Sequence, residues 1–107
     1  MDVCDPECPV ARASDVLSGK WTSLIVRDLL SGRKRYSELQ RSLAGISPRM
    51  LAMRLQMLEE QGLVEKTTYP TVPPKTEYEL TSAGHRMLPV IEALATFGAG
   101  LPSRVGA

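Results

Sequence analysis

The chain of 107 residues has little of what most enzymes and metal sites require. It contains one histidine, two cysteines and no glycine-rich phosphate-binding loop. A Ser/His/Asp triad would depend on the single His85 and on scattered partners, and His85 has no companions at metal-ligand spacing. We therefore expect a solvated or weakly packed His85, no catalytic or metal site, and no cofactor.

Long apolar runs are also missing. No stretch approaches the roughly 20 apolar residues of a membrane span, and the acidic, polar N-terminus is unlike a signal peptide. Apolar residues make up 43% of the chain and charged residues 23%, an ordinary globular composition, and the length suits one domain with a modest core. We expect a single cytoplasmic domain over residues 1–107 with no membrane partner.

The two cysteines, Cys4 and Cys8, lie close together near the N-terminus. Without a second cysteine pair or a nearby histidine they do not predict a zinc site, and a structural disulfide is rare in a cytosolic protein. Cys8 precedes Pro9 and an apolar pattern, which predicts a helix N-terminus, where the helix dipole favours the thiolate; Asp5 and Glu7 oppose that effect. Two interpretations stay open: a reactive thiol, or a small, partly buried residue.

Net charge is only +1, but its distribution is uneven. Residues 33–57 carry six basic side chains against Glu38, a balance of +5, whereas the segments before and after each balance to −2. The six are Arg33, Lys34, Arg35, Arg41, Arg49 and Arg54. A concentrated basic footprint suits phosphate binding, and a solvated basic face is the alternative.

Residues 48–61 form the clearest helix in the sequence. Ser47 is suited to cap its first amides, Pro48 to the first helical position and Gly62 to a left-handed stop. The helical period places its leucines, Leu51, Leu55 and Leu58, on one narrow face.

The opposite face of this helix carries Arg49, Met53 and Gln56, with Ala52 at its edge. Arginine and glutamine read base edges, and a small alanine permits close approach. An ordinary bundle helix is the alternative, but the pattern favours a recognition helix in a major groove. We expect Arg49, Ala52, Met53 and Gln56 to face bases. Five further residues are expected to hold phosphates or act from the wing: Arg35, Ser37, Ser47, Arg54 and Lys75.

The surrounding segments complete a winged helix-turn-helix of α+β, mostly α class. Ser37 to Gln40 predicts a capping box in which Gln40 reaches back to the cap amide, so that the helix-turn-helix covers about residues 37–61. A two-stranded wing follows at about residues 63–80, with Lys75 at its basic tip. Apolar helices at about 9–18 and 82–98, the latter kinked at Pro89, are suited to a dimer interface.

The motifs, taken in order, resemble the HxlR family of bacterial, MarR-like winged helix-turn-helix regulators. The residues that carry the resemblance are CPV at 8–10, GKWT at 19–22, RYSEL at 35–39, GISPRML at 45–51, LEEQGLV at 58–64, YP at 69–70, VPP at 72–74 and YELTSAG at 78–84.

The resemblance implies a homodimer, joined through its first and last helices, that binds double-stranded DNA at an inverted-repeat operator. It also implies that Cys8 occupies the position of the cysteine through which several members sense oxidants or electrophiles; Cys4 lies outside the motif, and no inducer is identified. Two rival functions remain: a winged-helix protein-interaction module without specific DNA binding, and a thiol-redox protein that uses Cys4 and Cys8.

Overall fold

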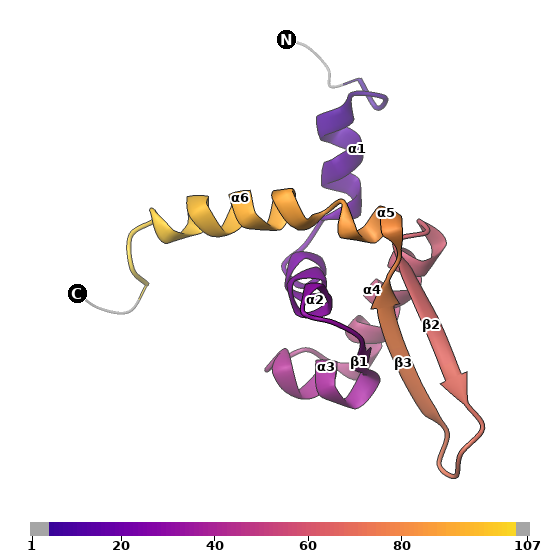
Figure 1. Cartoon of the computed structure of the whole chain (residues 1–107). Helices are drawn as coiled ribbons and strands as arrows, with labels where there is room; N and C mark the ends of the chain where they lie inside the picture. The colour runs from indigo at the N-terminus through magenta and orange to yellow at the C-terminus, as the bar shows by residue number, and fades with distance from the viewer. Residues whose placement is uncertain (1–4, 105–107) are drawn as a thin grey trace.

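The computed structural model describes residues 5–104 and shows a helical domain with a three-stranded antiparallel sheet (Figure 1). The elements, in chain order, are α1 (Pro9–Val16), α2 (Trp21–Leu30), β1 (Lys34–Arg35), α3 (Tyr36–Ser42), α4 (Pro48–Glu60), β2 (Val64–Tyr69), β3 (Lys75–Leu80), α5 (Ser82–His85) and α6 (Leu88–Ala99). Among these residues no helix is both long and apolar enough to cross a bilayer. The order of elements confirms the winged helix-turn-helix.

The core lies where α2, α3, α4 and the sheet meet. Leu51, Leu55 and Leu58 of α4 are buried, as the helical period predicts. The other large apolar side chains of this core are Ile25, Val26, Leu29, Leu39, Leu43, Ile46, Val64, Tyr78, Leu80 and Met87. Trp21 and Leu24 are half-buried and pack at its edge.

Both ends of α4 form as the sequence predicts. The Ser47 hydroxyl accepts the N–H of Met50 at 3.0 Å, and Pro48 occupies the first turn, where its missing N–H costs nothing. At the other end Gly62 has φ +75°. Its N–H bonds to the Glu59 carbonyl, and the N–H of Leu63 bonds to the Leu58 carbonyl, both at 2.9 Å. These two bonds make a Schellman stop.

The sheet has the order β1-β3-β2. The long hairpin of β2 and β3 pairs Val64 with Leu80 and Tyr69 with Lys75, and the short β1 adds to the other edge of β3. The turn of this wing therefore consists of residues 70–74. The prediction that Lys75 is a tip residue is wrong, since Lys75 begins β3.

Two other local predictions are wrong. The capping box was expected to run from Ser37 to Gln40, but helix α3 begins at Tyr36 with Arg35 as its cap residue. The Glu38 carboxylate, not Gln40, accepts the cap N–H of Arg35, at 2.7 Å. The expected kinked helix over residues 82–98 is instead two helices, α5 and α6. Pro89 lies in the first turn of α6, because proline is tolerated there and disrupts a helix interior.

Helices α1 and α6 extend away from the rest of the domain (Figure 1). Neither contains a buried residue. The exposed apolar side chains on and beside them are Val10, Leu88, Val90, Leu94, Phe97 and Leu101. A helix of eight residues such as α1 is marginal in water by itself, so these surfaces are suited to cover by another chain.

Candidate nucleic-acid interface

The outer face of α4 is open to solvent, as the sequence predicts. Arg49, Ala52, Met53 and Gln56 are all exposed, and Met53 retains 50% of its accessible surface. Gln56 donates a hydrogen bond to the Glu60 carboxylate at 3.3 Å. Arg49 makes no side-chain hydrogen bond or ion pair with any other residue in the range 5–104. The face thus presents a guanidinium and an amide separated by small or flexible side chains.

Three polar contacts tie α3 to its neighbours: to the start of α4, to the turn before it and to α2. The Tyr36 hydroxyl donates to the Pro48 carbonyl at 3.0 Å, and the Gln40 amide donates to the Ile46 carbonyl at 2.8 Å. Ser42 of α3 donates to Asp28 of α2 at 2.6 Å. Gln40 therefore stabilises the turn of the helix-turn-helix. The prediction that Gln40 caps α3 is wrong. No local pattern marks Tyr36, because its partner is a backbone carbonyl twelve residues away.

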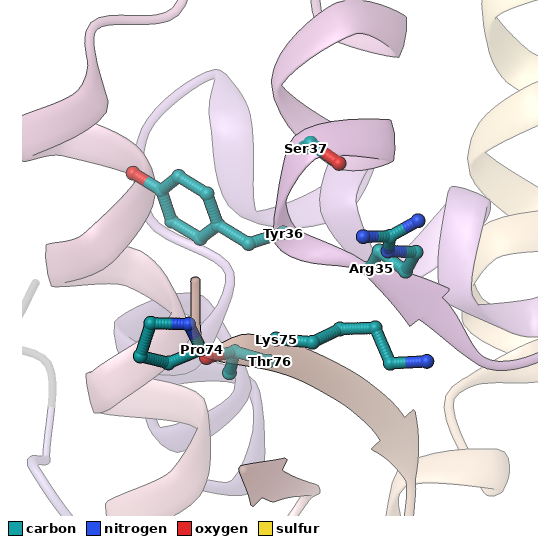
Figure 2. A pocket seen from close by; sticks show the side chains of 6 residues that line it. All are labelled: Arg35, Tyr36, Ser37, Pro74, Lys75 and Thr76. Carbon is teal, nitrogen blue, oxygen red and sulfur yellow. The ribbon is translucent and has the colours of Figure 1, made fainter. Parts of the chain in front are cut away.

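An open hollow of about 260 Å³ separates the start of α3 from the turn end of the wing. It is lined by Arg35, Tyr36, Ser37, Pro74, Lys75 and Thr76. Figure 2 shows the charged ends of Arg35 and Lys75 on the same side of this hollow, with the Tyr36 ring directed away from them. Folding thus brings together three of the five residues that the sequence assigned to phosphates or the wing: Arg35, Ser37 and Lys75.

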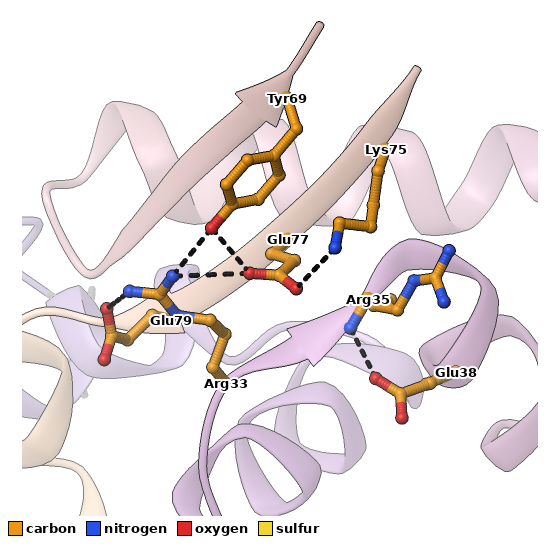
Figure 3. Close-up of polar contacts among 7 residues, drawn as sticks. All are labelled: Arg33, Arg35, Glu38, Tyr69, Lys75, Glu77 and Glu79. Atoms are coloured by element: carbon orange, nitrogen blue, oxygen red, sulfur yellow. Dashed lines mark hydrogen bonds and ion pairs between the residues drawn. The ribbon is translucent and has the colours of Figure 1, made fainter. Parts of the chain in front are cut away.

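Lys75 also belongs to a polar network that runs along the wing (Figure 3). Its ammonium lies 3.9 Å from the Glu77 carboxylate and 4.8 Å from the centroid of the Tyr69 ring. The Tyr69 hydroxyl donates to Glu77 at 2.9 Å, and Arg33 donates to Tyr69, Glu77 and Glu79 at 3.1, 3.3 and 2.8 Å. This network joins the chain before β1 to both strands of the wing.

The network changes the charge pattern that the sequence suggested. Hydrogen bonds from Arg33 to Glu79 and Glu77 raise the pKa of Arg33, so its charge is compensated within the fold. The hydrogen bond from Tyr69, with that from Arg33 and the nearby Lys75, lowers the pKa of Glu77 against an opposing effect of burial. Arg33 is therefore a structural cation, and the free positive charge of residues 33–57 is smaller than the sequence indicates.

The wing should lose stability in acid. Because the pKa of Glu77 is lowered in the fold from about 4.5, its ionised form contributes stability above that pH, and the contribution is lost as pH falls through the folded pKa. We expect Glu77→Gln to lose less stability than wild type between pH 7 and acid, measured by urea unfolding. Glu65→Gln, which alters an exposed carboxylate of β2, is the matched control. Parallel pH dependences for wild type and Glu77→Gln would contradict this assignment.

The remaining residues of the predicted site occupy different positions. Ser47 is engaged as the cap of α4. Arg54 is half-buried, and its guanidinium lies against Gly19 in the turn between α1 and α2. Cys8 is half-buried at the cap position of α1; its N–H bonds to the Asp5 carbonyl at 2.9 Å. Cys4 lies outside the described residues.

Known proteins are similar to this chain in both sequence and architecture. The sequence pattern of the HxlR-like helix-turn-helix family matches residues 16–104. An uncharacterised HTH-type transcriptional regulator of Methanothermobacter thermautotrophicus is 40% identical over 99 residues, which cover 91% of this chain and 76% of the relative. YdeP of Bacillus subtilis, described in the same words, is 36% identical over 98 residues, 92% of this chain and 77% of its own.

Solved structures of regulators have the same fold as this chain. A MarR-family transcriptional regulator of Porphyromonas gingivalis superposes with a TM-score of 0.87 at 41% identity, covering 95% of this chain and all of its own. The redox regulator HypR in its oxidised form gives 0.82 at 35% identity, over 90% of this chain and 99% of its own. These likenesses in sequence and structure extend over nearly the whole domain, and the chain belongs to the HxlR-like helix-turn-helix family.

Proposed function

We propose that this protein, a DNA-binding transcriptional regulator, acts as a homodimer that places the α4 helices of its two protomers in successive major grooves of an inverted-repeat operator. The observation that carries the proposal is the exposed outer face of α4, where Arg49 and Gln56 stand beside Ala52 and Met53 on a helix whose ends and inner face are fixed by capping and burial. In this proposal the protein binds DNA and catalyses no reaction.

The positions of the side chains indicate which part of the DNA each of them would contact. Arg49, Ala52, Met53 and Gln56 meet base edges, because they point outward from the helix. Arg35, Ser37 and Lys75 meet one stretch of backbone at the hollow between α3 and the wing. The wing turn carries no charged residue, and Val72 is fully exposed there, so the turn would meet the minor groove through shape and apolar contact.

The proposed partner for α1 and α6 is a second copy of the chain. Their apolar side chains line an open hollow of about 730 Å³ that is formed by α1, the α1–α2 turn, Ser23 and Leu94. A two-fold axis through this region would present two α4 helices to one face of DNA. Half-sites about one helical turn apart, roughly 34 Å, would follow.

The test is binding of the reduced protein to the DNA upstream of its own gene and to a random duplex, by fluorescence anisotropy across salt concentrations. We expect tighter binding to the upstream DNA, with a steep salt dependence. If both duplexes bind equally, selection of genomic fragments with the purified protein should recover the operator. Absence of binding to any duplex at low salt would overturn the proposal in favour of a protein-interaction module.

A redox response through Cys8 is part of the proposal. It is supported by the position of Cys8 beside the proposed dimer interface and by the similarity to the redox regulator HypR in its oxidised and reduced forms. Hydrogen peroxide would oxidise the thiolate to a sulfenic acid while being reduced to water. Peroxide should then release the protein from its operator, Cys8→Ser should abolish the release, and Cys4→Ser tests whether Cys4 acts as a second thiol. Identical release from Cys8→Ser would remove Cys8 as the sensor.

A further inference from the structure

Arg54 lies in an unusual position for a basic residue of a recognition helix. Its guanidinium packs against Gly19 so closely that a Cβ at residue 19 would lie 2.8 Å from Nη2. Gly19 also has φ +80°, a conformation that L side chains rarely adopt. Glycine thus provides both the turn between α1 and α2 and the space that the Arg54 guanidinium occupies.

Arg54 has no anionic partner in the part of the chain that the structure describes. Its Nε is buried and makes no hydrogen bond. Three other cations of the domain are engaged: Arg27 pairs with Asp28 at 3.0 Å, Arg33 with Glu79, and Lys75 with Glu77. An unpaired, partly desolvated guanidinium is unfavourable in the isolated protein, and an external anion would compensate for that cost.

A second unpaired cation follows Gly19 directly in the chain. The Lys20 ammonium lies 4.5 Å from the centroid of the Trp21 ring, and within residues 5–104 Lys20 forms no ion pair. Contact with an aromatic face orders a lysine without neutralising it. Lys20 and the Arg54 guanidinium therefore adjoin the same glycine, one from the α1–α2 turn and one from α4.

The location of this pair relative to the wing follows from the geometry of α4. Arg54 and Glu59 are five residues apart, which is about 140° around the helix axis. Burial and, after it, the negative charge of Glu59 raise the pKa of Tyr78 in β3. Glu59 therefore lies on the side of α4 that faces the sheet. The 140° arc between them holds the buried Leu51, Leu55 and Leu58, and the exposed base-reading face occupies the longer arc. Arg54 and Gly19 consequently flank that face on the side away from Glu59 and the sheet.

We propose that Lys20 and Arg54 form a binding site for a DNA backbone phosphate on the side of α4 opposite the wing. The inference rests on the proposed function, because a recognition helix in a major groove has a phosphate backbone on each side of it. Arg35 and Lys75 bind the phosphate backbone on the wing side of α4, and the Lys20–Arg54 site binds the phosphate backbone on its other side. Gly19 is required because any side chain there would displace the guanidinium.

The experiment measures the slope of log K against log salt for Lys20→Gln and Arg54→Met, on the selected operator and on a random duplex. Methionine retains the packing of the arginine stem and removes the charge. Each lost phosphate contact should reduce the magnitude of the slope by about 0.9 per protomer, and affinity should fall by the same factor on both duplexes. Lys20→Arg should retain the wild-type slope.

Arg86→Gln is the matched control, since it removes one exposed positive charge from the junction of α5 and α6. It should leave the slope unchanged. Wild-type slopes for Lys20→Gln and Arg54→Met, in variants whose circular dichroism and thermal unfolding match wild type, would overturn the site, as would an equal reduction in Arg86→Gln. Failure of the proposed function is a separate result, because in that case the wild-type protein itself would bind no duplex.

Discussion

Replacing Gly84 with alanine should destabilise the protein by roughly 3 kcal/mol, the upper end of the usual cost of overpacking. Gly84 is buried in α5, and a Cβ at this position would collide with the Leu63 backbone carbonyl and lie 3.0 Å from Leu80 Cδ2. A flexible side chain could move aside, but the Leu63 carbonyl is held in place because it accepts the Thr81 N–H at 3.0 Å.

The collision would affect a junction of four elements. Thr81 accepts the Gly84 N–H at 3.0 Å and donates to the Gly62 carbonyl at 2.7 Å, directly after α4. Displacement of Leu63 would therefore disturb the end of α4, the start of β2, the end of β3 and the cap of α5 together. The sequence alone offered no reason to distinguish Gly84 from the other glycines.

Urea or thermal unfolding of Gly84→Ala against Gly98→Ala tests this prediction. Gly98 lies within α6, and a Cβ there meets nothing within 4 Å in the protomer, so the substitution should be neutral or stabilising by about 0.5–1 kcal/mol. A Gly84→Ala protein as stable as Gly98→Ala would show that the chain at Leu63 can shift at little cost.

Replacing Arg49 with alanine should cost roughly 1–3 kcal/mol of operator binding and relax the sequence preference at one base pair in each half-site. Arg49 lies in the first turn of α4, exposed and without an intramolecular hydrogen bond or ion pair among residues 5–104. Its guanidinium can therefore make bidentate contacts without first breaking a bond within the protein.

The measurement compares Arg49→Ala with Lys20→Gln on the operator and on duplexes that carry single base-pair changes. Arg49→Ala should lose its discrimination at one position and bind random DNA nearly as wild type does. Lys20→Gln should weaken binding to all duplexes alike. A uniform loss in Arg49→Ala would show that Arg49 contacts phosphate and reads no base.

Gln56 should contribute less to discrimination than Arg49, although both face outward. Its amide already donates to Glu60, so binding a base requires that this hydrogen bond be exchanged. The same reasoning applies to Lys75, whose contact with a phosphate would compete with the Glu77 carboxylate. Arg49, Lys20 and Arg54 have no ion partner among residues 5–104, so DNA contact demands less rearrangement from them.

The sequence by itself determined α4 and most of what surrounds it. Caps, glycine stops and the 3.6-residue period act over neighbouring residues, so Ser47, Gly62 and the leucines Leu51, Leu55 and Leu58 could be assigned correctly from local chemistry. The outward direction of Arg49, Ala52, Met53 and Gln56 followed from the same helical period, and the wing strands followed from residue composition and, in β3, from alternation.

Only the tertiary structure decided which charges remain free. Arg33 is separated in sequence by more than forty residues from Glu77 and Glu79, and the three meet because β1 pairs with β3 in one particular register. The contact between Arg54 and Gly19 likewise depends on how the α1–α2 turn packs against α4. Local patterns place a side chain on a face of its own helix or strand, whereas its charge partners depend on the packing of distant elements. The sequence therefore located the exposed outer face of α4, and the fold determined which cations beside it are engaged by carboxylates of the described residues.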